Sequence, residues 1–260
     1  LDISLDPLPA TITGTLTFDG GQGTVDDTEF SIILTDNAGV TVPNTITWID
    51  INGVKTGEYS INVPLLGSST PFIVDLSFEH DDYYDITPLP LQLSENQEEE
   101  NNDFTLYAKP ATITGRVTFD GGHGSVDDWG TELSMSLLDE NGDPVINSLD
   151  WLVDVNGDRT GDYEITVPLS FNGVLPGIDT GYDATLSWAH QNYEVLPSDE
   201  LTLNENIVDS NHNFDFVPIP ATISGHIDIY GGGNYDDDVI LTIVTTTGFV
   251  NLPYTWIEDI

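Results

Sequence analysis

Short runs of alternating apolar and polar residues dominate the chain. TITGTLTF at 11–18 and TITGRVTF at 112–119 alternate with a period of two, which is typical of a strand with one buried face. GEYSINVP at 57–64 and GDYEITVP at 161–168 repeat this alternation, and turn residues such as Asn-Gly separate the runs. No stretch of the sequence has a helical period. The pattern therefore predicts an all-β protein.

One phrase occurs three times and sets the domain organisation. It reads ATITGTLTFDGGQGTVDD from Ala10, ATITGRVTFDGGHGSVDD from Ala111 and ATISGHIDIYGGGNYDDD from Ala221. The copies begin 101 and 110 residues apart, which is the size of a domain that buries its own core. About seven short strands per copy, with a turn about every 8–12 residues, favour a β-sandwich.

The repeats predict four segments. ISLDPLPATI at 3–12 lines up with FDFVPIPATI at 214–223 without a gap, so the chain is expected to begin on a strand of an earlier copy. We expect a longer protein with more copies. The alternative is that the orphan strand and the half repeat complement each other between neighbouring chains. The segments are the last strand of a preceding repeat (1–9), two β-sandwich repeats (10–110 and 111–220) and an incomplete third repeat (221–260).

A family resemblance follows from the order of these motifs. ATITGTLTF, FSIILTDNAGV, TGEYSINVP and LPLQLSENQEEENNDFTLYAK succeed one another in the first repeat. In this order they resemble carboxypeptidase regulatory-like domains and the related B-type repeats of bacterial surface adhesins. The resemblance implies tandem seven-stranded Greek-key sandwiches, Ig-like or prealbumin-like, that act as spacers in secreted or cell-surface proteins. The DGGQGTVDD insertion after the first strand and the extreme acidity depart from the family's pattern.

Composition narrows the classes of partner. The chain has 45 Asp and Glu against 4 Lys and Arg, a formal charge of −41, and no cysteine. This balance excludes nucleic acid, whose binding relies on cations that displace phosphate counterions, and disfavours an anionic membrane surface. No apolar run is long enough to insert into a bilayer. The acidity has two interpretations, a solvated surface that keeps a secreted protein soluble or carboxylates that collect divalent cations.

The loop after the first strand of each repeat is the first candidate metal site. Its glycines allow positive φ and expose backbone carbonyls beside adjacent aspartates. Ca²⁺ binds six to eight oxygens at about 2.3–2.6 Å, drawn from carboxylates, carbonyls and water. The loop is therefore interpreted either as a Ca²⁺ loop or as a solvated acidic turn. The candidate ligands are Asp19, Asp26, Asp27, Asp120, Asp127, Asp128, Asp237 and Asp238.

The segment DVNGDRTGDY at 154–163 is the second candidate metal site. Its polar residues occupy alternate positions, as in the first part of a calcium loop. Ile165 stands where that pattern needs a bidentate acid, and a β-hairpin turn on Asn-Gly is the alternative interpretation. The matching segment at 50–59 has Val54 in place of one carboxylate. The candidate ligands are Asp154, Asn156, Asp158 and Asp162.

Histidine and tryptophan recur at matching positions. His80 and His190 share one position, and one histidine per repeat cannot build a zinc site, which needs three or four ligands. We expect each to lie at a strand end, bonded to a neighbour. Trp48 and Trp151 precede the same hairpin and are expected in the core. A carbohydrate-binding platform is the alternative and requires these rings to lie exposed in a row.

The sequence favours a structural protein over an enzyme. It has no Ser-His-Asp order, nucleophile elbow or phosphate loop, and tandem copies of a catalytic centre are unusual. We predict a spacer repeat of an extracellular or cell-surface filament or adhesin stalk, stiffened by Pro110, Pro220 and Ca²⁺ in the acidic loops. Its expected partners are neighbouring copies of itself or further repeats of the same chain. The alternative is an adhesin module that binds a glycan or a host protein.

Overall fold

The computed structural model describes residues 7–51, 54–65, 72–170, 182–226, 242–245 and 248–251. Contacts divide the chain into two compact units, Leu1–Ile219 and Pro220–Ile260, which are described separately. Most of the strand expected at 1–9 lies outside the described residues, and residues 7–9 form no strand. Asp237 and Asp238 also lie outside them.

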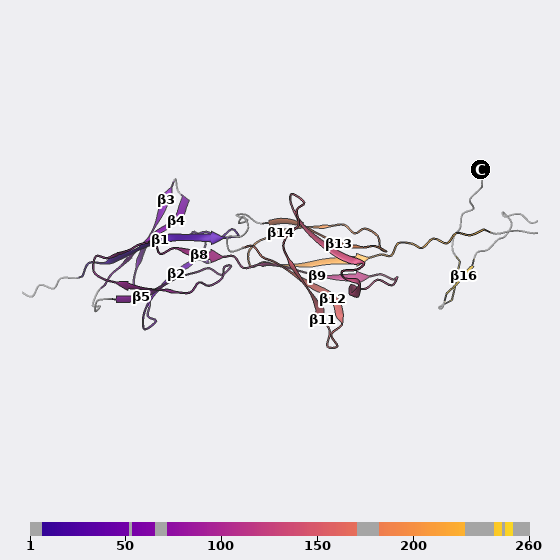
Figure 1. The fold of residues 1–260 in the computed structure, drawn as a ribbon, viewed down its shortest axis with the longest axis horizontal. Helices are drawn as coiled ribbons and strands as arrows, with labels where there is room; N and C mark the ends of the chain where they lie inside the picture. The colour runs from indigo at the N-terminus through magenta and orange to yellow at the C-terminus, as the bar shows by residue number, and fades with distance from the viewer. Residues whose placement is uncertain are drawn as a thin grey trace, which may run out of the picture. The chain divides into compact units, whose positions relative to one another are not determined.

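The first unit is built from strands, which confirms the all-β prediction. We call β1–β8 module 1 and β9–β15 module 2 (Figure 1). Module 1 contains β1 (Ala10–Asp19), β2 (Ser31–Asp36), β3 (Thr45–Ile51), β4 (Val54–Val63), β5 (Phe72–Glu79), β6 (Leu89–Leu93), β7 (Glu98–Glu99) and β8 (Phe104–Tyr107). Module 2 contains β9 (Ala111–Phe119), the 3-10 helix η1 (Val126–Asp128), β10 (Leu133–Asp139), β11 (Ser148–Val153), β12 (Arg159–Val167), β13 (Tyr182–His190), β14 (Asp199–Leu203) and β15 (Val208–Phe216).

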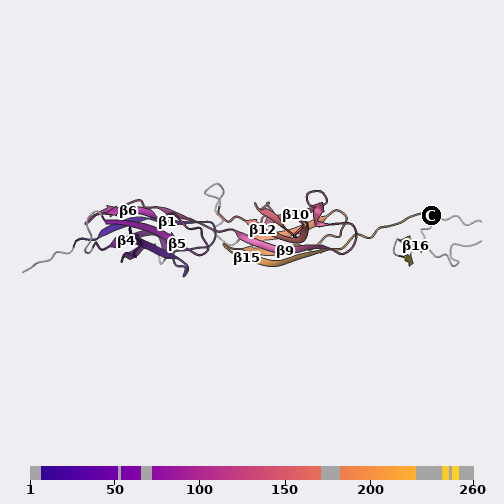
Figure 2. The same cartoon turned by 90° about the horizontal axis from the view of Figure 1, so that it is seen from below.

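Each module has two sheets of the same topology (Figures 1 and 2). In module 1 the order is β3-β4-β1, with β7 and β8 along the other edge of β1, and the second sheet is β2-β5-β6. In module 2 the sheets are β11-β12-β9-β15 and β10-β13-β14. The period-two pattern explains the packing: Ala10, Ile12 and Leu16 of β1 are buried, while the residues between them are more exposed.

The first and last strands of each module lie side by side and run parallel, and we call this pair the parallel seam. Residues 16–19 of β1 pair with residues 104–107 of β8, and residues 115–119 of β9 pair with residues 212–216 of β15. The neighbouring pairings β1–β4 and β9–β12 are antiparallel. Because the two seam strands point the same way, the chain enters a module at one end of the seam and leaves at the other.

A glycine in each first strand allows a close approach across the seam. A Cβ on Gly14 would lie 2.1 Å from the carbonyl oxygen of Asn102. The hydroxyl of Tyr59 donates to the same oxygen at 2.5 Å. Any larger residue at this position would displace backbone, which is why TITG carries a glycine inside a strand. The equivalent residues in module 2 are Gly115, Tyr163 and His212, with distances of 1.9 and 2.7 Å.

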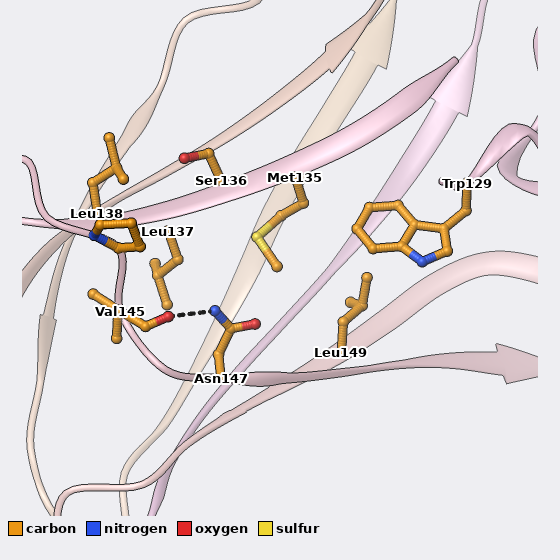
Figure 3. A pocket seen from close by; sticks show the side chains of 9 residues that line it. Trp129, Met135, Ser136, Leu137, Leu138, Val145, Asn147 and Leu149 are labelled. Atoms are coloured by element: carbon orange, nitrogen blue, oxygen red, sulfur yellow. Dashed lines mark hydrogen bonds between the residues drawn. The ribbon is translucent and has the colours of Figure 1, made fainter. Parts of the chain in front are cut away.

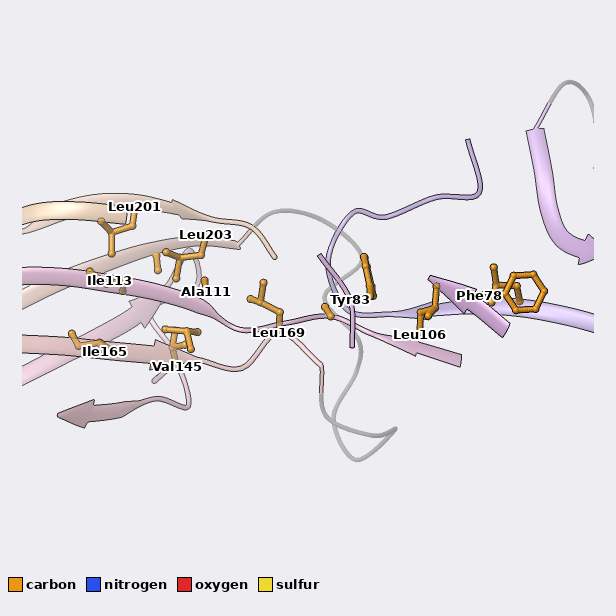
Figure 4. Packing of buried hydrophobic residues seen from close by; sticks show 14 of the residues in the cluster. Phe78, Tyr83, Leu106, Ala111, Ile113, Val145, Ile165, Leu169, Leu201 and Leu203 are labelled. Carbon is orange, nitrogen blue, oxygen red and sulfur yellow. The ribbon is translucent and has the colours of Figure 1, made fainter. Parts of the chain in front are cut away.

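The buried apolar side chains of both modules belong to one cluster. Figure 4 shows Leu169, from the loop after β12, and Tyr83 of module 1 near the boundary of the two modules. Both side chains are almost fully buried. The sheets are thus separate in each module, while the apolar packing continues across their boundary. Independent folding of each repeat stays a prediction.

The second unit contains one described hairpin. β16 (Thr242–Thr245) pairs with β17 (Gly248–Asn251) in antiparallel register, and residues 221–226 form no strand. In the part of the chain that the structure describes, no helix is long and apolar enough to cross a membrane.

Candidate functional site

The glycine loop of module 1, residues 19–27, is held by a buried tyrosine. Gly20 and Gly21 have φ of 79° and 70°, values that favour glycine. The Tyr83 hydroxyl donates to the carbonyl of Gly20 at 2.8 Å and accepts from the N–H of Gly23 at 2.7 Å. A Cβ on Gly23 would lie 2.4 Å from the Tyr83 ring. The loop therefore wraps around the tyrosine, and Tyr193 holds Gly121 and Gly124 in the same way in module 2.

Asp27 acts as the lock of this loop. It accepts hydrogen bonds from the N–H of Thr24 at 2.5 Å and from its hydroxyl at 3.0 Å. His80 Nε2 lies 3.3 Å from Asp27 Oδ2, the oxygen that also accepts from the N–H of Thr24. Its Nδ1 accepts from the N–H of Asp82, an arrangement in which Nε2 carries the proton that faces Asp27. Burial raises the pKa of Asp27, but these hydrogen bonds outweigh burial and leave it below its ordinary value.

Module 2 repeats the lock with different neighbours. Asp128 accepts from the N–H of Ser125 at 2.7 Å, and His190 Nε2 lies 3.4 Å from Asp128. Here the loop closes into η1, whose first turn Ser125 caps. Both histidine side chains are almost fully buried. The prediction of strand-end histidines bonded to a neighbour is confirmed.

The first aspartate of the pair in module 1 points to a different partner. Asp26 forms a salt bridge with Lys55, whose ammonium lies 6.0 Å from the ring centroid of Trp48. Asp26 and Asp27 are thus adjacent in sequence but serve separate contacts. The backbones of Asp19 and Asp120 bond to the ends of the closing strands. The N–H of Ala108 donates to the carbonyl of Asp19, and the N–H of Asp120 donates to the carbonyl of Phe216. The exposed Asp127 has its N–H bonded to the hydroxyl of Ser125.

The second candidate site adopts a tight hairpin turn. Asp154 Oδ1 accepts from the N–H of Asn156 at 2.8 Å and of Asp158 at 3.0 Å, and Asp154 N–H donates to the carbonyl of Asp158. These amides hold the pKa of the Asp154 carboxyl below its ordinary value. Asp162 lies outside the turn, paired with Arg116 at 2.8 Å. The structure brings three of the four predicted ligands into one turn and directs the fourth elsewhere.

Among the described residues, no three acidic or histidine side chains gather closely enough to hold a metal ion. Asp27, Asp128 and Asp154 use carboxylate oxygens to accept loop hydrogen bonds. Calcium binding stays a prediction.

The cations are the functional side chains that sequence reasoning missed. Arg159 lies 5.7 Å from the Trp151 ring centroid and donates to the carbonyl of Val126 at 3.0 Å. It therefore clamps the loop of module 2 as Lys55 clamps that of module 1. A signal was present, because both residues follow Asn-Gly by two positions.

The aromatic rings pack inward. Trp48 and Trp151 are partly buried against the core, at 6.0 Å from Tyr59 and 6.2 Å from Tyr163 between ring centroids. Trp188 is almost fully buried and lies 5.4 Å from Trp151. These contacts fit the core interpretation of the tryptophans.

A groove of about 450 Å³ lies beside β10 in module 2 (Figure 3). Apolar side chains such as Met135 and Leu149 line it, and its polar lining residues are Ser136 and Asn147. The amide of Asn147 donates to the carbonyl of Val145 at 2.8 Å. The lining includes no acidic, basic or histidine side chain, so this groove offers no acid–base chemistry.

Comparisons with known proteins found similarity to solved structures only. No protein-family model matches it, and no curated protein matches it. The solved structures that it is similar to include the Bacillus anthracis TIE protein, at 12% identity and a TM-score of 0.40, covering 82% of this chain and 34% of that one. The chain thus spans about a third of the length of that protein. GBS52, the minor pilin of Streptococcus agalactiae, matches at 6% identity and a TM-score of 0.29, with 84% and 100% covered. The major pilin of Streptococcus pyogenes matches at 12% and 0.23, with 82% and 98% covered.

Proposed function

We propose that the chain is a structural spacer of an extracellular or cell-surface filament or adhesin stalk. The parallel seam carries this proposal, because it sets the entry and the exit of a module at opposite ends. β1 has 10 residues, so one seam separates the two ends by roughly 33 Å at the strand rise of about 3.3 Å per residue. Each added copy then lengthens the protein instead of folding it back.

The seam also gives a module resistance to force. A pull on the two ends acts along the seam strands, so the hydrogen bonds between them are loaded together rather than one after another. Residues 16–19 and 104–107 provide this ladder in module 1. In module 2 the ladder extends over residues 112–119, with one irregularity in register. The partners of such a spacer are further repeats of the same chain.

The acidity suits an exposed position. A formal charge of −41 makes copies repel one another laterally and keeps the surface solvated. The few cations are used within the protein, for example Lys55 on Asp26 and Arg116 on Asp162.

Location can be tested by labelling intact cells. Antibodies raised against the 260-residue chain are applied to cells of the source organism before and after permeabilisation, and gold particles are located by electron microscopy. The proposal expects label on intact cells at a distance from the membrane. Label that appears only after permeabilisation would contradict it.

A finer part of the proposal is that Ca²⁺ stiffens the acidic loops. Its support is the charge of the chain and the exposure of loop carboxylates such as Asp26, whose side chain is 63% exposed. An ion at a hundredfold excess over its Kd stabilises a fold by about 2.7 kcal/mol. We expect the Tm in low salt to rise with millimolar CaCl₂ more than with equal MgCl₂, and to fall on chelation. An unchanged Tm in all three conditions would contradict a role for Ca²⁺ and would favour the interpretation that the acidic residues keep the surface solvated.

A further inference from the structure

Hydrogen bonds between a loop and a turn bridge the boundary of modules 1 and 2, which both lie within the compact unit Leu1–Ile219. The N–H of Gln22 in the glycine loop donates to Glu205 Oε1 at 2.7 Å. The Tyr83 hydroxyl lies 3.5 Å from the same oxygen. Glu205 belongs to the turn between β14 and β15. A carboxylate of module 2 therefore rests on the backbone of module 1.

The shape of the glycine loop fits this carboxylate. Gly20 and Gly21 both have positive φ, and a Cβ on Gly21 would lie 2.8 Å from Glu205 Cδ. The N–H of Gln22, the residue that follows these two glycines, faces the carboxylate. A hydrogen bond to an ionised acceptor is about twice as strong as one between neutral groups. The loop thus leaves room for a carboxylate and supplies a donor to it.

Further contacts surround this bond. The side-chain amide of Asn206 donates to Asp82 Oδ1 at 3.1 Å. The hydroxyl of Ser170 donates to the carbonyl of Ala108 at 3.2 Å. A Cβ on Gly20 would lie 1.9 Å from the carbonyl oxygen of Leu169, so the two backbones touch there. The boundary is therefore a packed joint with a polar rim.

Each half of this joint occurs a second time: the glycine loop recurs in module 2, and the Glu-Asn turn recurs in module 1. In module 2, Gly121 and Gly122 have φ of 85° and 77°, and Tyr193 holds the loop as Tyr83 does. In module 1 the turn before β7 contains Glu95 and Asn96, and Asn96 has φ of 55° against 54° for Asn206. Among the described residues, no group accepts from the N–H of His123, and none donates to the Glu95 carboxylate.

We propose that the glycine loop of each module is a docking socket for the Glu-Asn turn of an adjoining module of the same kind. The occupant is such a module because the joint between modules 1 and 2 already shows this pairing, and each module carries one copy of both halves. The contact is head-to-tail, so it adds modules in one direction. The main bond uses a backbone N–H, so the change from Gln22 to His123 does not remove it. Asp82 becomes Asn192, whose side-chain oxygen is still an acceptor but carries no charge.

The full 260-residue chain allows a direct test, because it has no cysteine of its own. Spin labels are attached through Ser31→Cys and Ser134→Cys, both exposed strand positions, one in each module. Pulsed electron paramagnetic resonance then measures the distribution of distances between the two labels. The parent is expected to give one narrow peak. Glu205→Ala should broaden it about twofold, because modules without a firm interface move relative to each other.

Glu95→Ala is the matched control, since it removes the same side chain from the same turn in module 1. It should leave the peak narrow. Glu205→Gln keeps an acceptor and removes the charge, so it should broaden the peak less than Glu205→Ala, and circular dichroism shows whether each variant is folded. Any of three outcomes would overturn the proposed docking. These are a narrow peak in folded Glu205→Ala, equal broadening by Glu95→Ala, and a broad peak in the parent. The result does not depend on where the protein works, so it is separate from the cell-labelling experiment.

Discussion

Modules 1 and 2 share the buried contacts that close the glycine loop and differ in the strand that closes the sheet. Both close the glycine loop with a buried histidine on an aspartate, His80 on Asp27 and His190 on Asp128. The closing strands differ: module 1 divides its closing strand into β7 and β8, while β15 runs unbroken through module 2. The comparison indicates that the loop geometry depends on a few buried groups and tolerates change around them.

The clamping cations Lys55 and Arg159 also occupy a shared position but make different contacts. Lys55 reaches a carboxylate, that of Asp26, whereas Arg159 reaches a backbone carbonyl, that of Val126. Both lie over a tryptophan ring. The two modules thus share the position of the positive charge but not the group that it contacts.

The largest effect is expected at the glycine of the parallel seam. Gly14→Ala and Gly115→Ala should each destabilise their own module by roughly 3 kcal/mol, because the new Cβ collides with backbone. Urea unfolding followed by module-specific NMR signals measures both. Gly142→Ala is the control: it has positive φ but open space around it, so it should cost only about 1 kcal/mol. Equal losses at all three glycines would show that the close approach is unimportant.

The buried histidines come next. His80→Phe and His190→Phe keep a ring in the core but remove the histidine's contact with the loop aspartate, which still accepts hydrogen bonds from its own loop. We expect each to lower the free energy of unfolding by about 2 kcal/mol, the range for a hydrogen bond to a charged group. Chemical denaturation of both variants checks this. If one module tolerates the change, the lock is not shared.

The clamping cations should matter less. Lys55→Met and Arg159→Met should each cost about 1 kcal/mol, the sum of a cation–π contact and one polar contact. Their salt dependence should differ, because salt screens the exposed ion pair of Lys55 more than the carbonyl contact of Arg159. Thermal denaturation at low and high NaCl separates them, and identical salt dependence would contradict the assigned acceptors.

Acid should weaken module 1 through Asp27. Its folded pKa is lowered, so its contribution is complete above the unfolded value of 3.8 and is lost as pH falls from there through the folded pKa. Asp27→Asn should flatten the pH dependence of stability in this acidic window. Unfolding curves from pH 6 to pH 2 test this. An unchanged slope would place the acid sensitivity elsewhere.

The fold was predictable because its signals are local. The alternation in TITGTLTF and GEYSINVP depends only on neighbouring residues, and the repeat phrase locates each first strand. The pairing of β1 with β8 joins residues about ninety positions apart and leaves no local mark. The partners of the glycine loop are also far away in sequence, since Asp27 meets His80, 53 positions away, and Gln22 meets Glu205, 183 positions away. Adjacent aspartates therefore suggested a metal site, while their partners became visible only in three dimensions.

Single-molecule pulling on the ends of the chain tests the central claim most directly. The account predicts two discrete unfolding events, one per module, each releasing roughly 300 Å of chain for about 100 residues. Gly14→Ala should lower the force of one event and leave the other unchanged. Gradual extension without discrete events, or equal forces in parent and variant, would contradict a spacer held by its parallel seams.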